Sequence, residues 1–99
     1  MKDLNEARLM LNDIDDKMKA LFIERMNVVK EIAEYKKNNS LPVYDSSREK
    51  EMIERLSKDI VEVKDNYIAF LNCILKESKN YQEKIINLWA YLIKRKKKN

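Results

Sequence analysis

The chain has 99 residues, of which 44% are apolar and 38% charged, and it contains no glycine, no histidine, one proline and one cysteine. This composition excludes glycine-rich phosphate loops, dinucleotide fingerprints and histidine-based triads, and a single chain cannot form an ordinary zinc site or a disulfide. The near absence of turn-forming residues predicts one small domain made of long helices.

The net charge of +4 comes from the C-terminal run 94–98, because the rest of the chain sums to about −1 without these five positive charges. We therefore do not expect the body to bind nucleic acid, and the basic tail at 94–99 is either a solvated helix end or a binding segment. The start, MKDLNEARLM, lacks an apolar signal region, and no stretch reaches the roughly 18 apolar residues of a membrane helix. These features, with the single cysteine, predict a cytoplasmic protein that does not associate with membranes.

The first predicted helix runs from Leu4 to the pair Asn38-Asn39, with Asp3 as its N-cap and Pro42 beyond its end. Its apolar positions follow the 3,4 spacing of a coiled-coil seam, which consists of Leu4, Ala7, Leu11, Ile14, Met18, Leu21, Arg25, Val28, Ile32 and Tyr35. A helix of about 34 residues is about 50 Å long, whereas a compact globule of this size is only about 33 Å across. We therefore expect this helix to project from its protomer and its seam to pack on a second copy of the chain.

A short second helix is predicted to start near Ser46 or Ser47, where Ser46-x-x-Glu49 matches a capping box. Its apolar face consists of Met52, Ile53, Leu56, Ile60 and Val63. We expect a break at 64–66 and then a third helix whose seam consists of Tyr67, Leu71, Ile74, Ser78, Tyr81, Ile85, Leu88 and Leu92. The sequence thus predicts an all-α fold with three helices in long–short–long order, forming one domain at 1–93 within a homodimeric bundle.

Two polar residues, Arg25 and Ser78, occupy seam positions that ordinarily carry apolar side chains. A buried guanidinium keeps its proton, so Arg25 requires a structural ion pair, water or an anionic ligand. Lys36 lies on nearly the same helix face about 16 Å further along, and the two cations could bracket a small anion. Gln82, one turn after Ser78, offers a donor and an acceptor, although it could equally be a surface glutamine.

Arg8 lies about 25 Å from Arg25 along the same helix, so one small molecule cannot contact both within a protomer. Taken alone, Arg8 is an exposed surface charge. If the helix pairs antiparallel with its twofold copy, however, the N-terminal part of one chain reaches the middle of the other.

Together these positions resemble the all-helical, AroQ-type chorismate mutases, in particular the bacterial chorismate mutase domain that is fused to prephenate dehydratase. The resemblance covers about residues 4 to 85. It is carried by Arg8, by IDDKMKALFIERMNVVKEIAEYK with Arg25 and Lys36, by PVYDSSRE with Asp45, Arg48 and Glu49, and by ESKNYQ with Ser78 and Gln82.

The resemblance implies an intertwined homodimer that converts chorismate to prephenate in phenylalanine and tyrosine biosynthesis, without a cofactor or metal. It also implies a substrate site in which Arg25 and the partner's Arg8 clamp the two carboxylates, while Lys36 and Gln82 donate to the ether oxygen. On the other side of this site, Glu49 and the backbone at Asp45 would bind the ring hydroxyl. Arg48 would pack along the substrate, and Ser78 would lie near a carboxylate. Ile32, Met52 and Leu75 are the expected apolar walls. Because Glu49 is assigned to the substrate, Asp45 or Ser46 is expected to hold the start of the second helix. Because no dehydratase or regulatory domain follows in this sequence, feedback inhibition of the fused type is not expected.

Two alternatives remain at the level of the sequence. An isochorismate-pyruvate lyase shares the architecture and much of the pocket, although the segment from Asp45 to Glu49 follows the mutase pattern. A non-enzymatic helical dimerisation module with a basic tail explains the seams, but it does not explain the polar residues at matched spacing.

Overall fold

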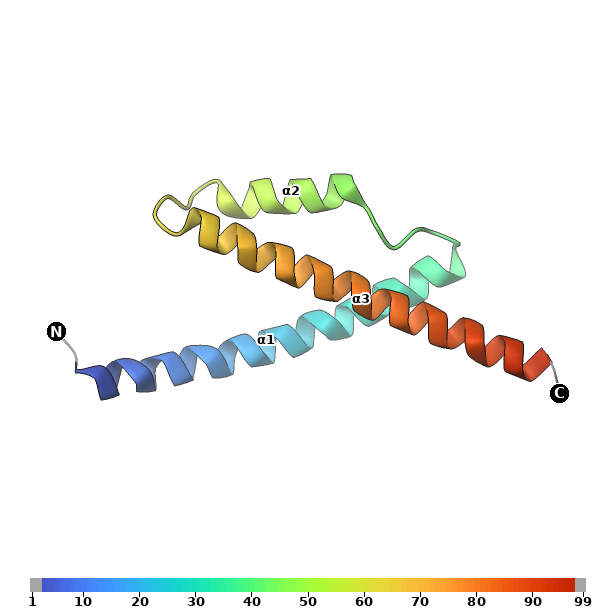
Figure 1. The fold of residues 1–99 in the computed structure, drawn as a ribbon, viewed down its shortest axis with the longest axis horizontal. Coiled ribbons are helices and arrows are strands. Elements are labelled where there is room, and N and C mark those ends of the chain that lie inside the picture. The colour runs from blue at the N-terminus through green and yellow to red at the C-terminus, as the bar shows by residue number, and fades with distance from the viewer. Residues whose placement is uncertain (1–2, 98–99) are drawn as a thin grey trace.

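The structure is a computed structural model that describes residues 3–97, and three helices account for most of this range. Helix α1 spans Leu4–Asn38, α2 spans Ser46–Ser57 and α3 spans Lys64–Lys97 (Figure 1). No strand occurs between residues 3 and 97. The predicted all-α class and the long–short–long order are therefore confirmed.

The ends of α1 follow the sequence signals. The Asp3 side chain accepts a hydrogen bond from the backbone N–H of Glu6 at 2.8 Å, which caps the first turn. At the other end, Ser40 adopts a φ of 53°, in the left-handed region that often follows a helix, and Pro42 then prevents its continuation.

The start of α2 does not use the capping box that Ser46 and Glu49 match, and of the two expected cap residues, Asp45 and Ser46, it uses the first. Asp45 is the N-cap, and its Oδ1 accepts from the backbone N–H of Arg48 at 3.0 Å. Ser46 is already the first helical residue, so its side chain is one position too late to cap. Glu49 is consequently not needed at the helix start.

The predicted break at 64–66 was wrong. Helix α2 ends at Ser57 and α3 begins at Lys64, so Ile60 and Val63 lie outside α2. The carbonyl of Val63 accepts from the backbone N–H of Tyr67 at 2.9 Å, which begins the new helix. The polar run at 64–66 looked like a loop, but an acidic residue such as Asp65 is favourable in a first helical turn because it complements the helix dipole.

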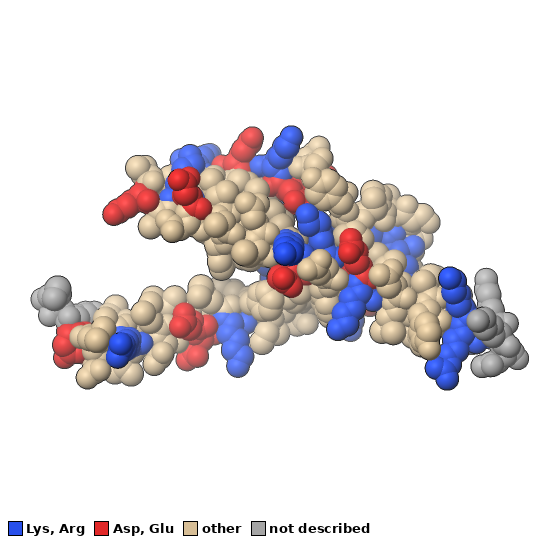
Figure 2. Space-filling model, viewed as in Figure 1, with Lys and Arg blue, Asp and Glu red and all other residues tan. Residues whose placement is uncertain are grey.

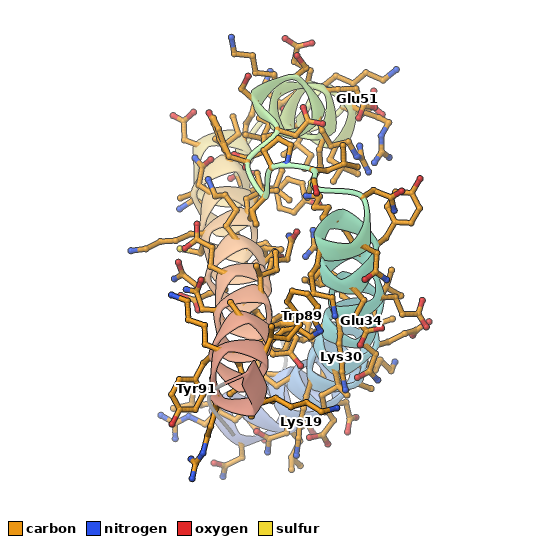
Figure 3. The ribbon with its side chains drawn as sticks, turned by 90° about the vertical axis from the view of Figure 1, so that its right-hand side faces the viewer. Lys19, Lys30, Glu34, Glu51, Trp89 and Tyr91 are labelled. Carbon is orange, nitrogen blue, oxygen red and sulfur yellow. The ribbon has the colours of Figure 1, made fainter. Side chains whose placement is uncertain are left out.

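Both α1 and α2 pack on α3, and Figure 3 shows α1 beside α3 with α2 at one end of the pair. The buried apolar core is small and consists of Val29, Ala33, Met52, Leu71 and Leu75. The Cα radius of gyration is 18.4 Å, and the protomer measures 67 × 30 × 15 Å. A compact domain of this length would have a radius of gyration of about 13 Å. The protomer is therefore elongated, as the length of the first helix predicted.

The predicted seam of α1 is not the face that packs within the protomer. The buried residues of α1 are Val29 and Ala33, each one position after the seam residues Val28 and Ile32. Apart from Arg25, which contacts α3, the seam residues stay exposed, with Leu21 at 63%. Figures 1 and 2 show the N-terminal part of α1 diverging from the body, with an open notch between them. An apolar stripe, interrupted by Arg25, is thus left uncovered by the chain's own helices.

The C-terminal part of α3 extends past the core toward the end of α1. The Lys37 ammonium lies 4.4 Å from the centre of the Trp89 ring, a cation–π contact that joins the two helices. Helix α3 continues to Lys97, whereas residues 98–99 of the predicted basic tail lie outside the described range. Within residues 3–97, each helix is either too short or too polar to cross a lipid bilayer.

Candidate active site

A cavity of about 260 Å³ lies where α1, α2, α3 and the α1–α2 connection meet. It is lined by Arg25, Val29, Ile32, Lys36, Val43, Asp45, Arg48, Glu49, Met52, Leu75, Ser78, Lys79 and Gln82. Seven of the eight polar residues singled out in the sequence are among them, as are the three expected apolar walls. The eighth, Arg8, lies on the diverging N-terminal part of α1 and does not line this cavity.

Arg25 and Ser78 form the contact between α1 and α3 inside the cavity. Arg25 Nη1 donates to Ser78 Oγ at 2.5 Å, and the Ser78 hydroxyl in turn donates to the Ile74 carbonyl at 2.8 Å. Because its only proton goes to Ile74, the hydroxyl of Ser78, itself 5% exposed, presents its lone pairs to Arg25. The serine therefore orients the guanidinium without neutralising it.

Arg25 has no carboxylate partner among the residues that the structure describes. Burial lowers the pKa of Arg25 below its ordinary value, and the positive charge of Arg48 lowers that pKa further. A structural ion pair, one of the three possibilities for the seam position, is thus not formed among the described residues. The remaining guanidinium donors are available to an anion.

Lys36 is positioned by the connection that follows its own helix. Its Nζ donates to the carbonyl of Val43 at 2.8 Å, and both residues line the cavity. One of the three ammonium donors is used in this bond, so two remain for a ligand. Because this hydrogen bond uses the backbone carbonyl of Val43 and not its side chain, sequence patterns could not have identified it.

The α2 side of the cavity carries Asp45, Arg48 and Glu49. Arg48 forms an exposed ion pair with Glu51, which contributes little to stability and does not hold the guanidinium firmly. Glu49 pairs with Lys79, whose Nζ lies 3.2 Å from Glu49 Oε2. Lys79 was missed in the sequence, because it follows a seam position and resembles an ordinary surface lysine. Its spacing of three residues from Gln82, which places both on one helix face, was the available signal.

Gln82 is 7% exposed, and its Oε1 is buried without any hydrogen-bond partner. An unsatisfied buried amide oxygen is unfavourable and uncommon in folded proteins. The alternative reading of Gln82 as a surface residue is therefore wrong. Because Gln82 lines the cavity and its unpaired atom is an acceptor, a bound molecule or water that donated to this oxygen would complete its hydrogen bonding.

The cavity is electropositive. Its lining includes four cations, Arg25, Lys36, Arg48 and Lys79, and two carboxylates, which leaves a net charge of +2. The described residues contain no group of three or more His, Cys, Asp or Glu side chains placed to hold a metal ion. The arrangement suits a small anion with more than one negative group.

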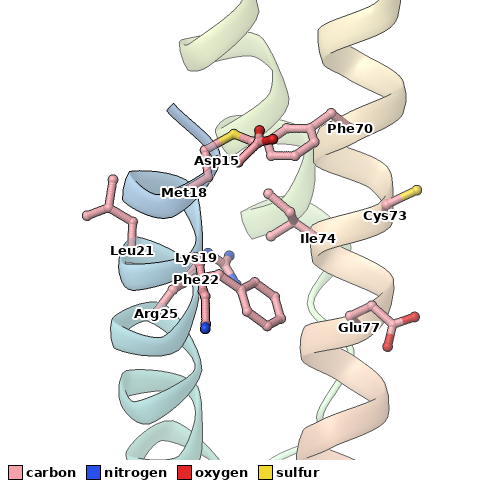
Figure 4. Close-up of a pocket in the computed structure, with 10 residues that line it drawn as sticks. All are labelled: Asp15, Met18, Lys19, Leu21, Phe22, Arg25, Phe70, Cys73, Ile74 and Glu77. Carbon is pink, nitrogen blue, oxygen red and sulfur yellow. The ribbon is translucent and has the colours of Figure 1, made fainter. Parts of the chain in front are cut away.

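A second and larger cavity, of about 640 Å³, lies between the N-terminal half of α1 and α3 (Figure 4). It is lined by Asp15, Met18, Lys19, Leu21, Phe22, Arg25, Phe70, Cys73, Ile74 and Glu77. Figure 4 shows Phe22 pointing from α1 toward α3, with Phe70 and Ile74 on the opposite wall. This cavity has few converging polar groups, so we assign the chemistry to the smaller one. Arg25 lines both and connects them.

These features define an all-α protein with a cation-rich cavity between its helices. The chain matches the family described as chorismate mutase type II over residues 7–83, and it belongs to that family. All eight polar positions singled out in the sequence fall within this range, whereas Trp89 and the basic tail lie beyond it.

Two relatives illustrate the match. The chain is 35% identical over 88 residues to the bifunctional chorismate mutase/prephenate dehydratase of Buchnera aphidicola subsp. Schizaphis graminum, a match covering 86% of this chain and 23% of that protein. It is 34% identical over 58 residues to the chorismate mutase of Methanocaldococcus jannaschii, which covers 59% of each chain. The matches therefore span less than two thirds of either relative. No solved structure gave a significant match.

Proposed function

We propose that this protein is a chorismate mutase, which converts chorismate to prephenate in phenylalanine and tyrosine biosynthesis. The observation that carries the proposal is the convergence of seven polar side chains from all three helices on one cavity, in a member of the chorismate mutase type II family. A helical dimerisation module has no need for seven polar groups around one cavity, five of which are buried or half-buried.

The chemistry suits what the cavity offers. Chorismate is a dianion, and its rearrangement is a one-molecule pericyclic shift that requires no nucleophile from the protein. The protein must hold the substrate in a folded form that brings the reacting carbons together. Negative charge develops on the ether oxygen as the C–O bond breaks, so donors aimed there favour the transition state over the ground state.

In this proposal three residues bind the charged and reacting atoms. Arg25 holds one carboxylate with the donors that Ser78 leaves free. Lys36 donates to the ether oxygen and also reaches a carboxylate with the donors not used by the Val43 carbonyl. Gln82 donates to the ether oxygen from the other side through its Nε2 group.

The α2 side of the cavity binds the rest of the substrate. Glu49 accepts from the ring hydroxyl, helped by the backbone at Asp45, while Arg48 packs along the substrate. Ser78 lies near a carboxylate, either directly or through water. The proposal includes no cofactor.

We further propose that the working form is an intertwined homodimer. The exposed seam of α1 and the apolar cavity beside it are surfaces that a second copy would cover. Because Arg25 lines both cavities, a helix seated in the larger one would also close the smaller. Arg8 lies too far along α1 to reach its own site, so we assign it to the site of the partner.

Mixing two inactive variants tests this exchange of Arg8. Arg8→Ala and Lys36→Ala should each be nearly inactive alone. A heterodimer formed by unfolding and refolding them together has one site with both native residues and one with neither, so about a quarter of the sites should recover under random pairing. The readout is chorismate turnover, with each variant refolded alone as the control. If no activity returns although mixed dimers form, Arg8 does not act in the partner's site.

The remaining assignments complete the proposal. We treat residues 1–93 as one catalytic domain and 94–99 as a basic tail, and we place the protein in the cytoplasm without nucleic acid or membrane as a partner. If nucleic acid is nevertheless bound, the affinity should fall steeply with salt and disappear when 94–99 are removed.

A turnover assay with product identification tests the function itself. Purified protein should consume chorismate and release prephenate. Incubation with isochorismate should release no pyruvate, because a lyase of the same fold is the nearest competing enzyme. A dimer that neither binds nor converts chorismate would leave the dimerisation module as the better description.

A further inference from the structure

Lys79 is a cavity residue outside the set that the family resemblance identified. It extends from α3 to α2, where its Nζ lies 3.2 Å from Oε2 and 3.4 Å from Oε1 of Glu49. The same ammonium lies 4.7 Å from the centre of the Tyr44 ring, in the connection before α2. Two contacts thus hold Lys79 at the cavity wall instead of letting it extend into solvent.

The stability of the fold does not explain this ion pair. The side chains of Lys79 and Glu49 are 30% and 21% exposed, and ion pairs that solvent reaches contribute little to folding. Helices α2 and α3 are already joined by the apolar contacts of Met52, Leu71 and Leu75. A lysine with a purely structural role at this position would be nearly dispensable.

The charge of Glu49 gives a functional reason for the pair. In the proposed function Glu49 shares the cavity with a dianionic substrate, and like charges repel at this range. Without Lys79 the net charge of the lining would fall from +2 to +1. The Glu49 carboxylate would then also be free to turn toward Arg25 or Arg48, and so to compete with the substrate for these cations.

The geometry of the pair leaves Glu49 able to bind a ligand. An ionised carboxylate has about four acceptor sites, and Lys79 approaches both oxygens, occupying about one site on each. The remaining sites can accept a hydroxyl. We propose that Lys79 is a positioning residue that neutralises Glu49 and holds its carboxylate in one orientation for the ring hydroxyl of the substrate. This inference rests on the proposed function.

A double-mutant cycle separates this role from its alternatives. The variants are Lys79→Met, Glu49→Gln and the two combined, with Lys79→Arg as the conservative replacement. Lys76→Met is the matched control, because Lys76 is an exposed lysine one turn earlier on α3 and does not line the cavity. The measurements are kcat and KM for chorismate, the dimer fraction and the thermal midpoint.

We expect Lys79→Met to lower kcat/KM about tenfold at an unchanged thermal midpoint, and Lys79→Arg to restore most of the loss. In the Glu49→Gln background, Lys79→Met should have less than about a twofold effect, because its influence passes through that carboxylate. An equal loss in both backgrounds would show that Lys79 contacts the substrate directly, and would overturn the inference.

Failure of the inference and failure of the proposed function give different results. Wild-type protein that does not convert chorismate overturns the proposed function, and the inference with it. An active wild type in which Lys79→Met behaves like Lys76→Met overturns the inference alone. A Lys79→Met variant that loses activity only because its thermal midpoint or dimer fraction falls also contradicts it, because the role is then structural.

Discussion

Replacing Lys36 with alanine is expected to lower kcat about a hundred- to a thousandfold while the protein remains folded and keeps the assembly state of the wild type. The ammonium is the donor that we assign to the ether oxygen, where negative charge develops as the C–O bond breaks. A donor aimed at such a charge stabilises the transition state more than the ground state, so its removal acts mainly on kcat. The measurement is steady-state turnover of chorismate, with circular dichroism and sedimentation as checks of fold and assembly.

The structure supplies a matched control for this variant. Lys30 lies on α1 with its side chain exposed (Figure 3), and it does not line the cavity. Lys30→Ala removes the same charge from the same helix and should leave kcat within about twofold of wild type. Loss of the bond to the Val43 carbonyl could loosen the α1–α2 connection, so the thermal midpoint of Lys36→Ala must be compared with that of Lys30→Ala. An active, folded Lys36→Ala dimer would refute the role of Lys36.

Replacing Gln82 with glutamate is expected to make activity depend on protonation of the introduced carboxyl group. The ionised form only accepts hydrogen bonds and repels the ether oxygen, whereas the protonated form carries an O–H donor. Activity near neutral pH should therefore fall by about a hundredfold or more, as for the loss of one donor at a developing charge. The activity of the variant should rise as the pH falls, because a growing fraction of the introduced carboxyl group is then protonated.

The pH range of this recovery follows from the surroundings of Gln82. The side chain of Gln82 is 7% exposed. Burial at this position would raise the pKa of the introduced carboxyl group above its usual value of about 4.3, whereas the cations of the cavity oppose that rise. The measurement is kcat/KM from about pH 7.5 down to about pH 4.5, with wild type in the same buffers. Asn80→Asp, on the exposed part of α3, should follow the wild-type profile. A variant whose rate did not rise in acid would show that Gln82 is not a donor to the ether oxygen.

The proposed active site leaves part of its charge and hydrogen bonding without a partner in the described chain. Arg25 is held by a neutral hydroxyl, Lys36 by a backbone carbonyl, and the amide oxygen of Gln82 by nothing within the described chain. Neither Arg25 nor Lys36 is paired with a carboxylate of the described chain. The substrate would therefore supply the negative charge and acceptors that Arg25 and Lys36 lack, while the amide oxygen of Gln82 lacks a donor. Binding and orientation of the substrate can be coupled in this way.

Several features followed from the sequence alone, because they depend on local periodicity and on residue types. The 3,4 spacing of apolar residues and the absence of glycine determined three helices, and the length of the first determined an elongated protomer. Arg25 and Ser78 stood out because a polar residue at an apolar seam position requires a reason. Arg8 could be excluded from its own site by helix rise alone.

Other features required the tertiary structure, because they depend on which faces meet. The burial of Val29 and Ala33, rather than of the seam residues before them, is set by the contact of α1 with α3. Choosing Asp45 over Ser46 as the cap depends on a single backbone position, which periodicity does not resolve. Lys79 became part of the site only because α2 and α3 pack together and bring it to a carboxylate 30 residues away in the chain. Periodicity within one helix cannot predict such a contact, because it contains no information about which residues of another helix will pack against it.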